Sequence, residues 1–337
     1  MQGSIRAVRS FARQFRTMSV EKIYYPRKVQ TAASDASLTL NHTSFRIKDP
    51  KVSVPFYEKH FGMQLLQKLE FPELQRDFYV LSFPKNVESL ENGAPGIFNL
   101  SGTLHLAHSH GTENDAGYRP NNGNEEPHRG FGHICFSVAD LPKECERLEA
   151  EGVAFKKRMS DGRQKNIAFA LDPDGYWIEL IQYNLPDTEP VDLGPKFNHT
   201  MLRVKDATKS LEFYQNVLGM TLLEVSEHAN AKFTLYFLGY PAADERLKRE
   251  GILELTHNWG TEDDADFAYH NGNTEPEGYS HMCVSLSDPA PLCADIEETY
   301  PDLEWEMRYN RGSIKNLAVL RDPDGYRIEV LPKSWSL

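Results

Sequence analysis

The chain has 337 residues, of which 40% are hydrophobic and 26% are charged, as expected of a globular protein with one to three domains. Its net charge of −12 argues against a general nucleic-acid or membrane binder, and no apolar run approaches the roughly eighteen residues of a membrane span. Four cysteines form no CxxC pair, so we expect free thiols in a reducing compartment: Cys135, Cys145, Cys283 and Cys293.

The first segment of the chain differs from the rest. Up to Met18 it contains no acidic residue, and four arginines recur every three or four positions: Arg6, Arg9, Arg13 and Arg16. This spacing places them on one face of an amphipathic helix, which is typical of a mitochondrial transit peptide; a disordered basic tail is the alternative. Met18 could serve as a second start, so we expect a mitochondrial or cytoplasmic location, or both. Residues 1 to about 35 are excluded from the predicted fold.

Strands and helices then alternate along the chain. Asp140–Gly152 has helical spacing with a terminal glycine, and DPDG at Asp172–Gly175 is a turn. The segment HTMLRVKD from His199 alternates like a strand, KSLEFYQNVLG predicts a helix that stops at Gly219, and FTLYFLGY and ILELTHNW predict two further strands. A second DPDG turn at Asp322–Gly325 leads into a last strand.

The chain is an internal duplication, which is the strongest organisational signal in the sequence. Four segments of the first half return in the second half: NHTSFRIKD as NHTMLRVKD, FYEKHFGMQLL as FYQNVLGMTLL, YRPNNGNEEPHRGFGHICFSV as FAYHNGNTEPEGYSHMCVSL, and KNIAFALDPDGYWIEL as KNLAVLRDPDGYRIEV. The pattern predicts an α+β fold of four βαβββ modules, two in each copy. We place the first unit at residues 36–184, a Pro- and Asp-rich linker at 185–196, and the second unit at 197–337.

Ionisable residues interrupt the apolar strands at matching positions of both copies. In the second copy these are His199 with Arg203, Glu254 with Asn258, His281 and Glu329; in the first copy they are His42 with Arg46, His105 with Ser109, His133 and Glu179. A buried ionisable group is costly unless it is paired or bound to a metal. Any one of these residues alone reads better as a satisfied core histidine or a surface glutamate, but repetition in both copies favours metal sites. Zinc is the default ion, and nickel, cobalt and iron stay open.

The motifs that carry these residues closely resemble the glyoxalase I family of the vicinal oxygen chelate superfamily. The resemblance covers nearly everything from His42 to Leu331, and it rests on HTMLRVKD…SLEFYQNVLGM, LELTHNWGTE, NGN…EP…G, GFGHICFSV and DPDGYWIE. It is closest to the fungal-type form, in which two glyoxalase units are fused in one chain. The resemblance implies a lactoylglutathione lyase that isomerises the hemithioacetal of methylglyoxal and glutathione to S-lactoylglutathione through an enediolate, and so detoxifies methylglyoxal.

The resemblance also implies two open barrels with metal sites shared between modules of different units. One site would consist of His199, Glu254, His133 and Glu179, and the other of His42, His105, His281 and Glu329. Glu179 would be the catalytic base, with Glu254 facing it across the metal. Glutathione would be the co-substrate, and the fused chain would be a monomer with no nucleic-acid or membrane partner.

The two sites are not expected to be equivalent. Residue types that the family uses for the carboxylates of glutathione are present at the first site: Arg203, Asn258, Arg129 and Lys157. At the second site, Arg46 matches Arg203. However, His105 occupies the position of the ligand glutamate, Ser109 that of the asparagine and His110 that of a neighbouring tryptophan. Glu277 and Met307 stand where Arg129 and Lys157 stand. We therefore predict that the second site is weakened, inactive or altered in its metal or ligand preference.

Two other functions fit the same fold. An extradiol dioxygenase would use iron held by two histidines and one carboxylate, whereas this chain offers four protein ligands and glutathione-holding arginines. A non-catalytic protein that sequesters a small molecule would have no use for Glu179 and Glu254 as bases.

Overall fold

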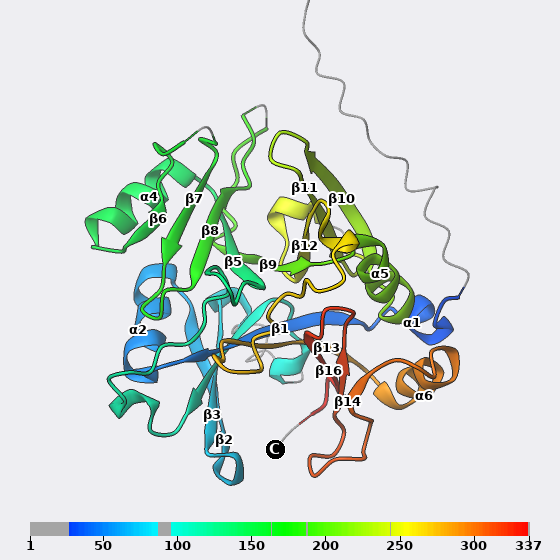
Figure 1. Ribbon diagram of the computed structural model, residues 1–337. Coiled ribbons are helices and arrows are strands. Elements are labelled where there is room, and N and C mark those ends of the chain that lie inside the picture. Colours follow the sequence, from blue (N-terminus) through cyan, green and yellow to red (C-terminus); the bar gives the residue numbers. More distant parts are fainter. Residues whose placement is uncertain (1–26, 87–95, 163, 187, 243, 336–337) are drawn as a thin grey trace, which may run out of the picture.

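The computed structural model describes residues 27–86, 96–162, 164–186, 188–242 and 244–335 (Figure 1). Most of the predicted transit peptide, residues 1–26, lies outside the described residues. The expectation that ordered structure begins only after about residue 35 is wrong, because the structure describes residues 27–35 as part of the fold. Helix α1 (Gln30–Ser34) is ordered, Val29 and Ala32 are buried, and the Thr31 amide donates to Asp295 Oδ2 of helix α6 (Pro289–Thr299) at 2.8 Å. Apolar contact therefore fixes these residues against the second unit.

Four modules of the predicted kind follow, each with one strand, one helix and three further strands. The first contains β1 (Thr39–Ile47), α2 (Pro50–Phe61), β2 (Gln64–Phe71), β3 (Arg76–Ser82) and β4 (Thr103–Ser109). The second contains β5 (Phe131–Val138), α4 (Leu141–Ala150), β6 (Phe155–Lys157), β7 (Ile167–Leu171) and β8 (Trp177–Gln182). The third contains β9 (Lys196–Val204), α5 (Ala207–Glu212) continued by a π-turn (Phe213–Val217), β10 (Thr221–His228), β11 (Phe233–Gly239) and β12 (Ile252–Asn258). The fourth contains β13 (Tyr279–Leu286), α6 (Pro289–Thr299), β14 (Trp305–Met307), β15 (Ala318–Arg321) and β16 (Arg327–Pro332).

The strands form two open eight-stranded sheets, and each sheet joins modules of different units. One sheet has the order β14-β15-β16-β13-β1-β4-β3-β2, and the other has the order β10-β11-β12-β9-β5-β8-β7-β6. In Figure 1 the second of these sheets occupies the upper half of the molecule and the first the lower half. The predicted α+β class with four βαβββ modules is confirmed. In the described part of the chain, no helix combines the length and the apolar character that crossing a bilayer requires.

Local sequence signals set the ends of the helices. Asp49, Asp140, Asp206 and Asp288 are the N-cap residues of α2, α4, α5 and α6, and each accepts a backbone N–H with its side chain. Helix α2 ends at Gly62, whose φ of 69° is easily reached only without a side chain. At the equivalent Gly219 a Cβ atom would also collide with the carbonyl of Ala32, which explains why glycine is required there.

The helices connect the two sheets through buried hydroxyl–carboxylate bonds. Tyr57 of α2 donates to Asp172 Oδ2 at 2.9 Å, and Tyr214, in the π-turn that continues α5, donates to Asp322 Oδ2 at 2.8 Å. Both aspartates open a DPDG turn and accept two backbone N–H groups with Oδ1. Burial, followed by the charge of the second aspartate in each turn, raises the pKa of Asp172 and of Asp322 to about 7.

These raised pKa values predict that the protein loses stability as the pH rises from about 4 to 7. Between an ordinary aspartate pKa of about 3.9 and the folded-state value, the folded protein binds more protons than the unfolded chain, so alkalinisation favours unfolding. Asp172→Asn keeps the acceptor for the turn amides and removes the charge. We expect it to be close to the parent in urea unfolding at pH 4 and to exceed it by about 4 kcal/mol at pH 8. An equal loss of stability at both pH values would contradict the assignment.

Candidate active site

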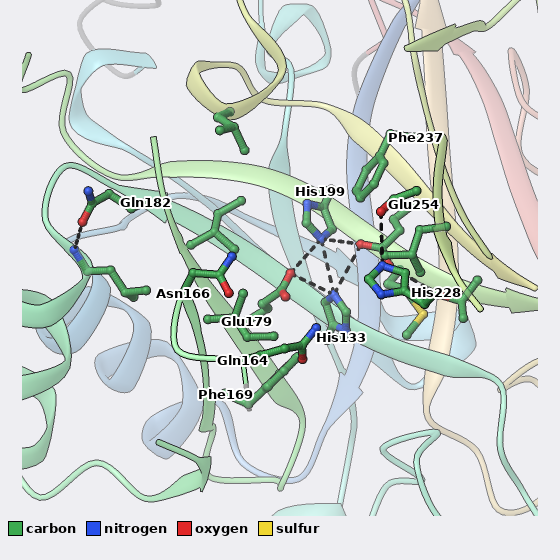
Figure 2. A pocket seen from close by; sticks show the side chains of 18 of the residues that line it. His133, Gln164, Asn166, Phe169, Glu179, Gln182, His199, His228, Phe237 and Glu254 are labelled. Atoms are coloured by element: carbon green, nitrogen blue, oxygen red, sulfur yellow. Dashed lines mark hydrogen bonds and ion pairs between the residues drawn. The ribbon is translucent and has the colours of Figure 1, made fainter. Parts of the chain in front are cut away.

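Four ionisable side chains converge in the upper sheet. His133, Glu179, His199 and Glu254 are all buried, and one donor atom from each lies within 4.8 Å of the others. His199 Nε2 is 3.1 Å from Glu179 Oε2 and 2.9 Å from Glu254 Oε2, and His133 Nε2 is 3.3 Å from His199 Nε2 (Figure 2). The structure thus brings together the four residues predicted for the first site.

The topology of the sheet explains this convergence. The four residues come from β12, β9, β5 and β8, which are the four central neighbours of the sheet. His133 and Glu179 belong to the first unit, whereas His199 and Glu254 belong to the second. The antiparallel pairing of β5 with β9 places Cys135 opposite His199, so the two halves of the group meet at the junction between units.

A second layer of hydrogen bonds orients His199. The Asn198 Oδ1 atom lies 2.8 Å from His199 Nδ1, and the Asn198 amide donates to the carbonyls of Arg246 and Arg249 at 2.6 and 2.9 Å. Because the amide orientation is fixed by these two carbonyls, Oδ1 accepts the Nδ1 proton and Nε2 is left facing the other three side chains. Such outer partners are a usual feature of metal-binding histidines.

Asn198→Ala is therefore expected to raise the metal concentration needed for half-maximal turnover by about 10–100-fold, because the imidazole loses its fixed tautomer and orientation. Metal titration of the metal-depleted protein measures this. Asn41, which makes the same bond to His42 in the other sheet at 2.7 Å, provides the matched control, since Asn41→Ala should leave that concentration unchanged. No change in Asn198→Ala would remove its orienting role.

The charges of the group are strongly coupled. Burial would raise the pKa of Glu179, but the two histidines outweigh it and hold that pKa well below its usual range. Burial likewise disfavours the protonated form of His199, yet the neighbouring thiol of Cys135 and the two carboxylates raise its pKa well above 6.5. Two carboxylates that share one imidazole in an apolar sheet need a positive charge between them, which a proton or a metal ion can supply.

The group lies in the wall of a cavity of about 730 Å³, large enough for a ligand of drug size. Figure 2 shows Phe169 and Phe237 on opposite sides of the four residues, with Gln164 and Asn166 on a neighbouring loop. Sequence reasoning did not identify these wall residues. His228 also lines the cavity, where its Nε2 lies 3.2 Å from the Ser226 hydroxyl.

The predicted substrate-binding residues fall into two groups. Arg129, Arg203 and Asn258 line the cavity, whereas Lys157 is not among its lining residues and donates to the carbonyls of Gln164 and Ile167 at 2.7 and 3.0 Å. Arg203 also has a structural role, because Nη1 donates to three backbone carbonyls of the first unit: those of Gly123, Gly130 and Phe131. Its guanidinium therefore connects the two units as well as facing the cavity.

The equivalent place in the lower sheet has a different arrangement. His42, His281 and Glu329 form a group with donor atoms within 4.8 Å of one another, but His105 is not a member of it. Its ring is stacked on that of His42, with centroids 3.5 Å apart and an interplanar angle of 9°. Arg46 is buried and its Nε lies 2.9 Å from Glu277 Oε2. The residues predicted for the second site are thus neighbours, in a geometry unlike that of the first.

Comparison with known proteins shows where the chain belongs. Residues 39–180 and 196–330 match the sequence profile of the Glyoxalase/Bleomycin resistance protein/Dioxygenase superfamily. The chain is 56% identical over 321 residues to a Saccharomyces cerevisiae protein named Glyoxalase I, covering 94% of this chain and 98% of that protein. This chain belongs to the glyoxalase I family.

Other members of the family support the assignment. A Schizosaccharomyces pombe lactoylglutathione lyase is 43% identical over 300 residues, with 87% of this chain and 95% of that protein covered. The crystal structure of glyoxalase I from Zea mays superposes with a TM-score of 0.67 at 26% identity, over 88% of this chain and 93% of that one. The similarity extends over both units, so the chain is a two-unit member of the family.

Proposed function

We propose that this protein is a metal-dependent lactoylglutathione lyase, which isomerises the hemithioacetal of methylglyoxal and glutathione to S-lactoylglutathione. The observation that carries the proposal is the convergence of His133, Glu179, His199 and Glu254 at a cavity of about 730 Å³. A chain 56% identical to a protein named Glyoxalase I supports the choice of reaction.

The donor set fits a divalent transition metal. Two neutral imidazoles and two carboxylates carry a charge of −2, which such an ion balances, and imidazole donors favour zinc, nickel, cobalt or iron over magnesium or calcium. Zinc is our first choice. When bound, the ion would stabilise the negative charge that develops on the two substrate oxygens as the carbon-bound proton is removed.

The residues of the chain handle the proton. Both contacts of Glu179 with the imidazoles use Oε2, so among the described residues Oε1 is available to a substrate in the cavity. Glu179 removes the proton from one carbon of the hemithioacetal and returns it to the adjacent carbon. Glu254, whose Oε1 accepts from the Thr256 hydroxyl at 3.3 Å, faces Glu179 from the second unit and is placed to act on the opposite face of the substrate.

The remainder of the cavity binds the rest of the substrate. Arg129 and Arg203 place two guanidinium groups in the cavity wall, and Asn258 adds an amide that donates to the Tyr269 hydroxyl at 2.8 Å. These groups suit the carboxylates and peptide carbonyls of glutathione. Phe169, Phe237 and Leu235 form an apolar surface, which suits the methyl group of methylglyoxal.

An assay of thioester formation tests the proposal. The purified, metal-loaded protein is mixed with methylglyoxal and glutathione, and the ultraviolet absorbance of the thioester is followed. We expect turnover that requires both reagents. Absence of turnover in a metal-replete sample would refute the function, whereas oxygen uptake with a catechol would favour the dioxygenase alternative.

We also propose that the protein works as a monomer, because one chain supplies residues from both units to each group of candidate ligands. We retain the proposal that the Arg-rich segment directs the protein to mitochondria, with a cytoplasmic form starting at Met18. Attaching residues 1–35 to a fluorescent protein tests this, and a purely cytosolic signal would contradict it.

A further inference from the structure

We propose that the cavity of the lower sheet is a metal site for a small, uncharged, oxygen-chelating ligand, and not a second site for the glutathione adduct. The cavity is lined by His42, His105, His281 and Glu329 together with an apolar wall. The proposal rests on the proposed function in one respect only, since it assigns turnover of the glutathione adduct to the cavity of the upper sheet.

The donor atoms of His42, His281 and Glu329 are arranged as a cation site would require. His42 Nε2 and His281 Nε2 are 3.1 Å apart, and His281 Nε2 is 3.5 Å from Glu329 Oε2. The Nδ1 atoms are occupied on their other side, by Asn41 Oδ1 at 2.7 Å and the Ser280 hydroxyl at 3.0 Å. The Asn41 amide donates to the carbonyls of Ile97 and Leu100, so its Oδ1 accepts the Nδ1 proton of His42. The lone pair on His42 Nε2 consequently faces the centre of the group, as a metal requires.

His105 supplies a further observation. Its Nε2 is buried and has no hydrogen-bond partner among the described residues, which is costly for a polar atom in an apolar strand. The ring is parallel to that of His42 and lies beside the group without joining it. An oxygen atom of a metal-bound ligand would give His105 Nε2 a hydrogen-bond partner. We therefore assign His105 as a residue that contacts the bound ligand.

The cations around this cavity are already paired. Glu277 Oε2 lies 2.9 Å from Arg46 Nε and 4.0 Å from Arg76 Nη2, and Glu306 Oε2 lies 2.6 Å from Arg327 Nε. Arg46 does not line the lower cavity, whereas its counterpart Arg203 does line the upper one. A tripeptide with two carboxylates would therefore have to compete with Glu277 and Glu306, and each fixed carboxylate would repel it.

The size and lining of the cavity agree with this charge pattern. Its volume is about 180 Å³, compared with about 730 Å³ for the upper cavity, and drug-sized ligands occupy cavities of about 300 Å³ or more. Aliphatic and aromatic side chains form much of the wall, with Phe98 against Trp335 in an edge-to-face contact at 5.1 Å. A compact aromatic or aliphatic molecule with one or two metal-binding oxygens fits these limits, and benzohydroxamic acid, which is neutral in solution at pH 7, is a probe of this class.

Cobalt binding tests the site without relying on activity. Three full-length proteins are dialysed against Co²⁺ and analysed for metal: the parent, His133→Ala/His199→Ala, and His42→Ala/His281→Ala. We expect about two ions per chain in the parent and about one in each double variant, with circular dichroism and thermal unfolding showing that each is folded. If a double variant is unfolded, the single changes His199→Gln and His281→Gln replace it. A parent that binds one ion per chain would overturn the proposal.

The ligand class is tested on the His133→Ala/His199→Ala protein, in which only the lower site can hold Co²⁺. Benzohydroxamic acid should change the visible Co²⁺ spectrum, and glutathione at tenfold higher concentration should not. Adding Glu277→Gln frees Arg76, which lines the cavity, and removes one repelling carboxylate, so it should make glutathione binding at least fivefold tighter. A spectral response to glutathione before that change, or no gain after it, would overturn the ligand class. Absence of turnover in the parent would instead refute the proposed function and leave these measurements valid.

Discussion

Glu179→Gln is expected to lower kcat for the hemithioacetal by about 10²–10⁴-fold, the usual effect of removing a general base. The amide has almost the same shape as the carboxylate and can still offer an oxygen to the metal, so the metal content should stay close to that of the parent. The neighbouring His133 and His199 outweigh the effect of burial and keep Glu179 ionised. Measured kcat together with metal analysis of the same sample separates lost proton transfer from lost metal.

Glu329→Gln is the matched change in the lower sheet. Since we assign turnover to the upper cavity, this variant should lose far less activity than Glu179→Gln, with an effect of about twofold or less. Equal losses would mean that both cavities turn over the adduct and would contradict the asymmetry. Retained turnover in a metal-replete Glu179→Gln sample would remove Glu179 from the mechanism.

Much of the fold could be predicted because the sequence contains an internal duplication, so each element is signalled in both copies. Strand alternation placed His199, Glu254 and their first-copy equivalents on recognisable faces, and the DPDG turns and terminal glycines set the ends of the elements. The pairing of modules across units did not follow from spacing. It came from the family resemblance, and the order of the two sheets confirms it.

Other features depend on packing that local patterns do not encode. Val29 and Ala32 follow the Arg-rich segment and have no repeat partner, so nothing in the sequence signals that they pack against the second unit. The ammonium of Lys157 satisfies loop carbonyls instead of lining the cavity, because the carbonyls of Gln164 and Ile167 lie within 3.0 Å. The stacking of His105 on His42 is a matter of rotamers, which residue type and spacing do not determine.

Removal of the metal by a strong chelator is expected to reduce turnover to the background rate and to lower the thermal unfolding temperature by several degrees. Without the cation, Glu179 and Glu254 share the upper group with two imidazoles, and a proton on His199 has to take the place of the ion. A bound ion stabilises the folded state by mass action, and its loss removes that contribution. Activity and unfolding temperature should both recover on addition of Zn²⁺ or Co²⁺, and Mg²⁺ should fail to restore them because imidazole donors bind it poorly.

The direction in which metal affinity changes with pH follows from the protonation of His199. Because the pKa of His199 is raised well above 6.5, the metal-free protein is protonated there at neutral pH, and binding of the ion has to release that proton. Metal affinity should therefore increase about tenfold for each unit of pH while one proton is released. Competition titrations with a chromophoric chelator at several pH values measure the slope. An affinity that does not change with pH, or a chelated sample that keeps its turnover, would show that the four side chains do not hold the ion.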